Sequence, residues 1–181
     1  DDANIPMHSI VHALAREEWR LYAPETVGLF FANAIYLGEG VMYYGDGLPP
    51  SVTLGGRRWN YMSGAIDVVA HELSHGVTDY TSQLVYEGQS GALNEAFSDG
   101  MGTAVEFFFQ PAGGGPLQAD YVMGEDVIRP GGLRSLENPG ANGDPDHYSR
   151  RFTGTQDNGG VHINATIPGH AFYLAVEGGT N

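Results

Sequence analysis

The spacing of hydrophobic and polar residues changes character along the chain. Between residues 30 and 54, short apolar runs alternate with turn sequences such as Gly-Asp-Gly at 45–47, which predicts strands joined by tight turns. Residues 66–82 and 92–109 instead repeat their apolar positions with the period of amphipathic helices. The first part of the chain is thus expected to be rich in strands and the later part in helices.

The amino-terminal segment carries a helix signal of its own. Asn4 is a suitable capping residue and Pro6 favours a first helical turn, so we predict a helix that ends near Tyr22. The apolar residues expected on one face of this helix are Met7, Ile10, Val11 and Leu14.

Two long segments are rich in glycine and proline. Residues 110–119 and 129–160 are therefore expected to be loops, and a last helix to begin near Ile167 and to be cut off by the chain end. We predict an α+β fold with a cleft between two parts. Residues 1–65 form the amino-terminal helix and an irregular β-rich region, and residues 66–181 form a helical region with long ordered loops.

Charge and composition narrow the choice of partners. The 181 residues carry a formal charge of −14, and all eight basic residues are arginine. Such a balance argues against a nucleic-acid partner, whose phosphates would be repelled, and is compatible with bound cations. The absence of cysteine excludes disulfides and thiol chemistry. No apolar run approaches the roughly 18–20 residues of a membrane-spanning helix, so no membrane partner is expected.

The sequence His-Glu-Leu-Ser-His at 71–75 predicts a metal site. Residues four apart lie on one face of a helix, so His71 and His75 can direct their rings at one ion. Glu95, at the start of the next predicted helix, supplies a third ligand. Three protein ligands and one open position are typical of catalytic zinc. Glu72 is then placed to act as general base on a metal-activated water.

Two residues of the second helix are candidates to support these ligands. Asp99 lies four residues after Glu95 on the same face and can accept the second ring proton of a ligand histidine. Asn94 is a similar candidate.

Four motifs together resemble thermolysin and its relatives, the neutral zinc metallopeptidases of the gluzincin group. They are IDVVAHELSHGVTDY, GALNEAFSD, GEDV and TGTQDNGGVHIN, within a match that runs from about Asn33 to Leu174. The resemblance implies a thermolysin-like catalytic core with zinc on His71, His75 and Glu95. It also implies that Glu72 is the base.

Further roles come from the resemblance alone. It implies that His162 and Tyr86 stabilise the oxyanion, and that Asp157 orients His162. It implies substrate contacts for Arg134, on the carbonyl after the scissile bond, and for Asn33 and Ala34, which pair with the peptide backbone.

The family's pocket for the side chain after the cleaved bond maps onto apolar residues in this chain. This implies cleavage on the amino side of bulky hydrophobic residues, because burial of apolar surface favours such side chains. The residues concerned are Trp59, Met62, Val68, Met123, Val127 and Leu133.

A calcium site is expected away from the zinc. Asp67 near the start of one helix and Glu106 near the end of the other converge if the two helices are antiparallel, and calcium prefers clustered carboxylates. The resemblance adds Asp120 and Glu125 as ligands. Val122 stands where an acidic ligand is usual and offers only its carbonyl, so one structural calcium is expected rather than a pair.

The predicted function is that of a secreted zinc endopeptidase acting on peptide or protein substrates. Much of the family's amino-terminal sheet and its last helices are absent, which implies a compact member or a complementary chain or fragment of the same protein. Two alternatives stay open. One is an exopeptidase, which needs a group that captures a free terminus. The other is a folded but inactive zinc-containing binding fragment.

Overall fold

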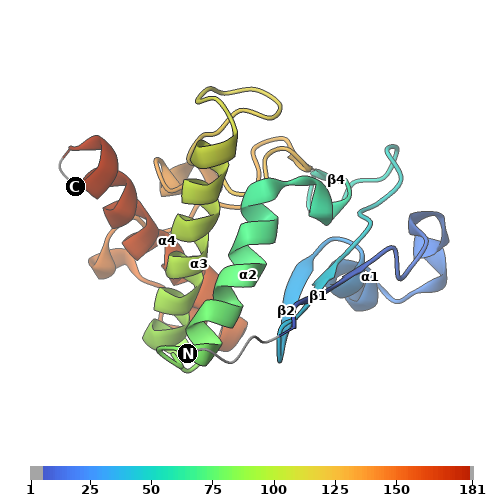
Figure 1. Ribbon diagram of the computed structural model, residues 1–181, viewed down its shortest axis with the longest axis horizontal. Helices are drawn as coiled ribbons and strands as arrows, with labels where there is room; N and C mark the ends of the chain where they lie inside the picture. The colour runs from blue at the N-terminus through green and yellow to red at the C-terminus, as the bar shows by residue number, and fades with distance from the viewer. Residues whose placement is uncertain (1–5, 180–181) are drawn as a thin grey trace.

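A three-stranded sheet and three long helices lie side by side in the computed structural model, which describes residues 6–179 (Figure 1). The sheet has the order β1-β3-β2, with β1 parallel and β2 antiparallel to β3. A separate two-stranded sheet pairs β4 with β5. The α+β prediction is confirmed. The strands are β1 (His8–Val11), β2 (Ala34–Gly38), β3 (Val41–Tyr44), β4 (Arg58–Trp59) and β5 (Ile128–Arg129).

The predicted amino-terminal helix is wrong. Residues 8–11 form strand β1, and only a 3-10 helix, η1 (Arg16–Leu21), follows. Pairing with β3 outweighs the local helical period, and the strand leaves Ile10 and Val11 exposed instead of burying them. The Asn4 cap lies outside the described residues.

Helix α1 (Pro24–Phe30) was not predicted. Proline occupies its first position, where the missing N–H costs no helical hydrogen bond, and this is the signal that could have found it.

The helices α2 (Ile66–Tyr80) and α3 (Gly88–Phe109) confirm the two predicted amphipathic segments, although α3 begins four residues earlier than expected. Helices α2 and α3 pack against each other, and α4 (Gln156–Glu177) packs against α3 (Figure 1). Within residues 6–179 no helix is long and apolar enough to cross a membrane. The remaining turns are the 3-10 helices η2 (Met62–Gly64), η3 (Pro139–Asn142) and η4 (Tyr148–Arg150).

The predicted start of the last helix near Ile167 is also wrong. Regular helical geometry begins at Val161, directly after four residues with left-handed backbone angles, and it continues through Pro168. The helix is not cut off by the chain end, because it finishes at Glu177, where the Gly178 N–H bonds to the Leu174 carbonyl. Pro168 was misleading because a proline can lie inside a helix that packing holds in place.

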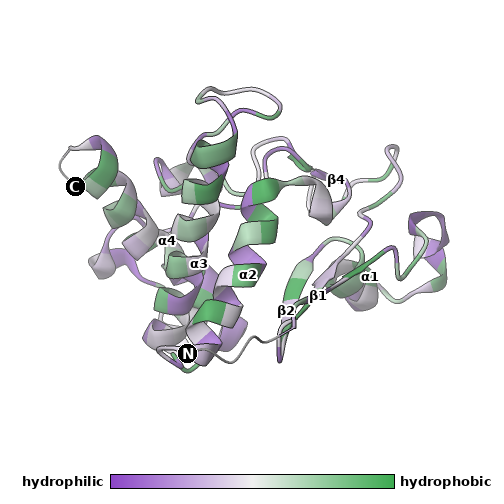
Figure 2. Cartoon of the chain, in the orientation of Figure 1, coloured by the Kyte–Doolittle hydropathy of each residue, from purple (hydrophilic) through white to green (hydrophobic). Residues whose placement is uncertain are grey.

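The main hydrophobic core joins the sheets to the start of α2. Met42 and Tyr44 of β3 pack with Val68 of α2, and Val127 and Ile128 beside β4 complete the cluster. The first turns of α2 are hydrophobic in Figure 2, in agreement with their place in this core. The core therefore fixes α2, and the histidines on it, relative to β2 and β3.

A glycine allows α2 and α3 to approach closely. A Cβ at Gly102 would lie 2.6 Å from the backbone oxygen of Asp67. We expect Gly102→Ala to lower the free energy of unfolding by about 1–3 kcal/mol through overpacking, despite the higher helix propensity of alanine. Urea unfolding checks this. Gly100→Ala is the control, because its Cβ would meet only the Phe172 ring at 3.7 Å, and an equal loss in both variants would contradict the prediction.

Candidate active site

Two neighbouring helices bring the three predicted zinc ligands to one point. The Nε2 atoms of His71 and His75 are 3.0 Å apart. The Glu95 carboxylate oxygens lie 3.5 Å from His71 Nε2 and 3.3 Å from His75 Nε2. Tetrahedral ligands at about 2.0–2.1 Å from zinc are separated by roughly 3.3 Å. The three groups therefore have the spacing that a zinc ion requires.

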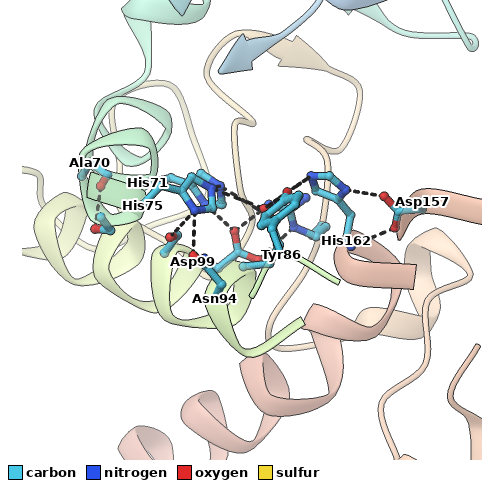
Figure 3. Close-up of polar contacts among 12 residues, drawn as sticks. Ala70, His71, His75, Tyr86, Asn94, Asp99, Asp157 and His162 are labelled. Atoms are coloured by element: carbon cyan, nitrogen blue, oxygen red, sulfur yellow. Dashed lines mark hydrogen bonds and ion pairs between the residues drawn. The ribbon is translucent and has the colours of Figure 1, made fainter. Parts of the chain in front are cut away.

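Oxygen acceptors on the far side of both rings determine which nitrogen carries the proton. His75 Nδ1 is 2.8 Å from the Asn94 side-chain oxygen, and His71 Nδ1 is 2.9 Å from the Asp99 carboxylate (Figure 3). Both Nδ1 atoms carry hydrogen to satisfy these acceptors, so in neutral rings both Nε2 atoms present lone pairs. Two lone pairs and a buried carboxylate that face one another call for a cation between them.

Buried carboxylates give the site a negative potential. Burial by itself lowers the pKa of His71, but the hydrogen bond to Asp99 and the charge of Glu95 prevail and raise it to about 9. Burial opposes the charge of Glu95, yet the neighbouring histidines and Arg134 hold its pKa well below the usual value. The site thus attracts positive charge, which a metal ion supplies.

Arg134 and Ser98 support the ligands from behind. Arg134 donates to both oxygens of Asp99, from Nε at 2.9 Å and from Nη2 at 2.7 Å, and Nη2 lies 3.5 Å from Glu95. The Ser98 hydroxyl is 3.3 Å from His75 Nδ1. Ser98 was not predicted, although its position four residues after Asn94, on the same helical face, could have indicated it.

Glu72 lies beside the predicted zinc ligands and lines a cleft. Its side chain is largely buried, and burial raises its pKa more than the charges of His71 and His75 lower it. A buried carboxylate with a raised pKa is a stronger proton acceptor than an exposed one. This environment suits a general base.

A sharp turn of the chain directs the His162 side chain toward the predicted zinc ligands. Residues 157–160, Asp-Asn-Gly-Gly, have φ angles of 55°, 49°, 81° and 82°, a region that glycine, Asn and Asp tolerate best. The Asp157 carboxylate accepts from the His162 backbone N–H at 2.8 Å and lies 2.5 Å from its Nδ1 (Figure 3). The same carboxylate thus begins the regular helix and orients the imidazole.

The hydroxyl of Tyr86 lies between His162 and Glu95, one of the predicted zinc ligands. Its hydroxyl donates to Glu95 and lies 3.1 Å from His162 Nε2. Partial burial and the charge of Glu95 raise the pKa of Tyr86 well above its ordinary value, so the phenol stays protonated and available as a donor. The structure therefore brings Tyr86, His162 and Asp157 together at the site.

A cleft of about 620 Å³ opens over these groups. Residues 33–38 line this cleft together with Glu72, His75 and His162, and the substrate contacts implied for Asn33 and Ala34 stay a prediction. Because β2 pairs only with β3, its other edge has no partner strand within residues 6–179. This edge lies along the cleft.

The predicted apolar pocket lies in the core rather than in the wall of the cleft. Met62, Val68 and Val127 are at most 6% exposed, with Trp59 and Leu133 packed against them. None of these residues, nor Met123, which is also buried, lines the cleft. Val68 is nevertheless one turn before Glu72 on α2, so this apolar cluster lies close beneath the candidate base.

An acidic cluster lies at the far ends of α2 and α3. Carboxylate oxygens of Glu106, Glu125 and Asp126 lie within 4.8 Å of one another. Both oxygens of Glu106 and of Glu125 are buried without a hydrogen-bond partner among the described residues. Buried, unpaired carboxylates in contact call for a cation, and oxygen donors suit calcium.

The cluster differs from the predicted calcium ligands. Asp126 was not predicted, although it directly follows Glu125. Asp67 accepts backbone N–H groups from Val68 and Gly124, and Asp120 accepts one from Val122. These three predicted residues, Asp67, Asp120 and Val122, therefore surround the cluster without joining its close group of oxygens.

Two histidines one helical turn apart, a carboxylate on the next helix and a buried glutamate beside them define the His-Glu-x-x-His class of metal-binding proteins. The pattern of the thermolysin metallopeptidase catalytic domain matches residues 4–79, and that of the thermolysin metallopeptidase alpha-helical domain matches residues 82–181. The chain belongs to the thermolysin metallopeptidase family, as the resemblance predicted.

Individual relatives agree with this assignment. A bacillolysin of Bacillus caldolyticus and a thermolysin of Alicyclobacillus acidocaldarius subsp. acidocaldarius are each 49% identical over 158 residues, which is 85% of this chain and 26% of theirs. The precursor of protealysin, a metalloproteinase from Serratia proteamaculans, matches in structure with a TM-score of 0.73 and 32% identity, over 98% of this chain and 52% of that one. The thermolysin-like fold is thereby confirmed, and the chain spans about a quarter of the length of these curated relatives.

Proposed function

We propose that the protein is a zinc-dependent endopeptidase. The observation that carries this proposal is the group formed by His71, His75 and Glu95, which has the spacing of three zinc ligands, with Glu72 buried beside it and facing a cleft. Structural zinc sites are usually closed by four protein ligands, commonly including cysteine. Three ligands and a neighbouring base favour catalysis over a binding fragment.

The residues of the cleft have separate tasks in peptide hydrolysis. Zinc bound to the three ligands would act as a Lewis acid and lower the pKa of a water molecule to about 7. Glu72 is placed to accept a proton from the attacking water and to pass it to the leaving amine. Tyr86 would turn its hydroxyl from Glu95 to the oxyanion, and His162, whose Nδ1 faces Asp157, would donate from Nε2 as the doubly protonated ring. Arg134 keeps Asp99 in place behind His71.

The free edge of β2 supports an extended peptide substrate. A peptide laid along residues 33–38 would add a strand to the sheet and use backbone groups that β3 leaves free. This mode requires no substrate terminus, since the strand can continue beyond the cleft at both ends. It therefore favours an endopeptidase that acts on peptides or unfolded protein segments.

The endopeptidase proposal is tested with peptides blocked at both ends. We expect the zinc-loaded protein to cut them internally, because the cleft needs neither a free amine nor a free carboxylate. Mass spectrometry of the products identifies the bond. Cleavage of unblocked peptides alone would favour an exopeptidase, and zinc binding without any cleavage would favour an inactive binding fragment.

We further propose cleavage on the amino side of bulky hydrophobic residues. The apolar cluster beneath Glu72 supports this preference, and Leu133 is one of the partly exposed residues packed against it. We expect Leu133→Asp to reduce cleavage before Leu and Phe at least about tenfold, since a charge replaces apolar contact. A peptide-library digest compared with wild type measures this. Leu117→Asp, on an exposed loop, is the matched control, and unchanged cleavage maps in the Leu133 variant would contradict the assignment.

One calcium ion in the acidic cluster is part of the proposal, with Glu106, Glu125 and Asp126 as its nearest ligands. Secretion is proposed from the family and from this site, because calcium is plentiful outside cells. The complementary chain or fragment stays a prediction, which mass spectrometry of the native sample addresses.

A further inference from the structure

A second hollow, of about 360 Å³, concentrates positive charge in this acidic protein. Three of its lining residues are Arg16, Arg58 and Arg129. The chain has only eight arginines and no lysine, against 22 acidic residues. The hollow shares no lining residue with the cleft beside Glu72, and it shares Asp126 with the acidic cluster.

Two of these arginines face each other across a sheet. Arg58 of β4 pairs directly with Arg129 of β5 in the antiparallel register (β4 is labelled in Figure 1). Side chains at such positions lie on one face with their Cβ atoms about 4.5–5.5 Å apart, and like charges there are destabilising. Both side chains line the hollow, and therefore their charges add up inside it.

The protein neutralises little of this charge. Arg58 makes no side-chain hydrogen bond or ion pair with any residue from 6 to 179. Arg129 approaches only Asp126, at 3.7 Å, through an oxygen that already accepts the Leu117 N–H. Arg16 donates to Asn60, and its guanidinium lies over the Tyr61 ring, 4.7 Å from the centroid; both partners are neutral. Among the residues that line the hollow, Asp126 thus supplies the one carboxylate against three guanidinium groups.

We propose that this hollow binds a small multivalent oxyanion. Guanidinium groups present paired N–H donors that match the oxygens of phosphate and carboxylate groups, and a bound dianion would relieve the repulsion between Arg58 and Arg129. The hollow also has an apolar wall that includes Trp59 and Leu48, which suits the carbon chain of a dicarboxylate. A volume of about 360 Å³ leaves room for a free anion of this kind. The proposal does not depend on the peptidase activity.

The test is calorimetric titration of the zinc- and calcium-loaded protein with sulfate, a non-chelating mimic of phosphate, and with succinate, both at constant ionic strength. We expect saturable binding. Arg58→Gln and Arg129→Gln should each weaken it about tenfold or more, because each removes charge-assisted hydrogen bonds. Arg57→Gln is the matched control: it makes the same charge change one residue away, but Arg57 bonds to Asn142 and does not line the hollow. Its effect should stay below about twofold.

The titrations with sulfate and with succinate distinguish between the two kinds of anion. Tighter sulfate binding identifies a phosphate-type anion, and tighter succinate binding identifies a dicarboxylate. Non-saturable heats for both anions would overturn the proposal, as would equal weakening in all three variants, which would show only a response to net charge. Arg58→Gln should also raise the unfolding midpoint of the anion-free protein, since it removes the like-charge pair. A lowered midpoint would likewise count against the proposal.

Discussion

Replacement of Glu72 by Gln is expected to leave zinc binding intact and to lower kcat/KM for a blocked peptide by about 10²- to 10⁴-fold. The amide has nearly the same shape as the carboxylate but cannot accept the proton of the attacking water. The three predicted zinc ligands are untouched, and Glu72 itself is 6% exposed. Zinc content by atomic absorption and peptide hydrolysis of the same sample measure the two effects together.

An exposed glutamate provides the control for this substitution. Glu17→Gln makes the same charge change on the exposed 3-10 helix η1 and should keep wild-type activity. A Glu72→Gln protein that carries full zinc and turns over substrate at the wild-type rate would refute the assignment of the base. Loss of zinc from this variant would instead show that Glu72 helps to hold the metal.

The close approach of the predicted zinc ligands could be derived from the sequence, because helix geometry sets most of their spacing. His71 and His75 lie one turn apart on α2, and Glu95 and Asp99 lie one turn apart on α3. A short connection between two amphipathic helices makes them neighbours, so the two pairs must meet. The contact of Asp99 with His71 and that of Asn94 with His75 follow from this packing.

Contacts between distant segments could not be derived in this way. Tyr86 and His162 are 76 residues apart, and their approach depends on four left-handed residues before His162. Only the family resemblance predicted that Tyr86 and His162 act at the same place. For Arg134 the resemblance implied a substrate contact, which stays a prediction, whereas its bonds to Asp99 were not foreseen and are seen only in the folded chain.

The errors in the fold have a common physical cause. Residues 8–11 have a helical period but pair with β3, and Pro168 has the signature of a helix start but lies inside α4. In both cases packing with distant residues outweighs a weak local preference. The acidic cluster shows the same effect, because a loop from another part of the chain carries Asp126 to Glu106.

Removal of calcium is expected to lower the unfolding midpoint of the zinc-loaded protein by about 5–15 °C, the shift that corresponds to loss of a saturating ligand in a chain of this size. The acidic cluster gives the reason. Burial, together with the neighbouring carboxylates, raises the pKa of Glu106 to about 9 and that of Glu125 to about 8. Without a cation, these side chains must either hold protons or repel one another.

The sign of the pH dependence follows from these pKa values. Glutamates in the unfolded chain have a pKa of about 4.3. Between this pH and about 8–9, the calcium-free folded state therefore binds protons that the unfolded state has released. Stability without calcium should therefore fall as the pH rises through this window. Bound calcium keeps the carboxylates ionised and flattens the dependence, so the shift caused by calcium should be larger at pH 9 than at pH 6.

A variant separates this effect from general charge screening. Glu106→Gln should raise the midpoint of the calcium-free protein above pH 7, because it removes one buried charge, and should largely abolish the response to calcium. Glu87→Gln, at the exposed beginning of α3, changes the same charge away from the cluster and should respond as wild type. Differential scanning calorimetry at both pH values measures these shifts. A full calcium response in Glu106→Gln would place the ion elsewhere, because a carboxylate at the centre of the cluster cannot be dispensable to an ion that it holds.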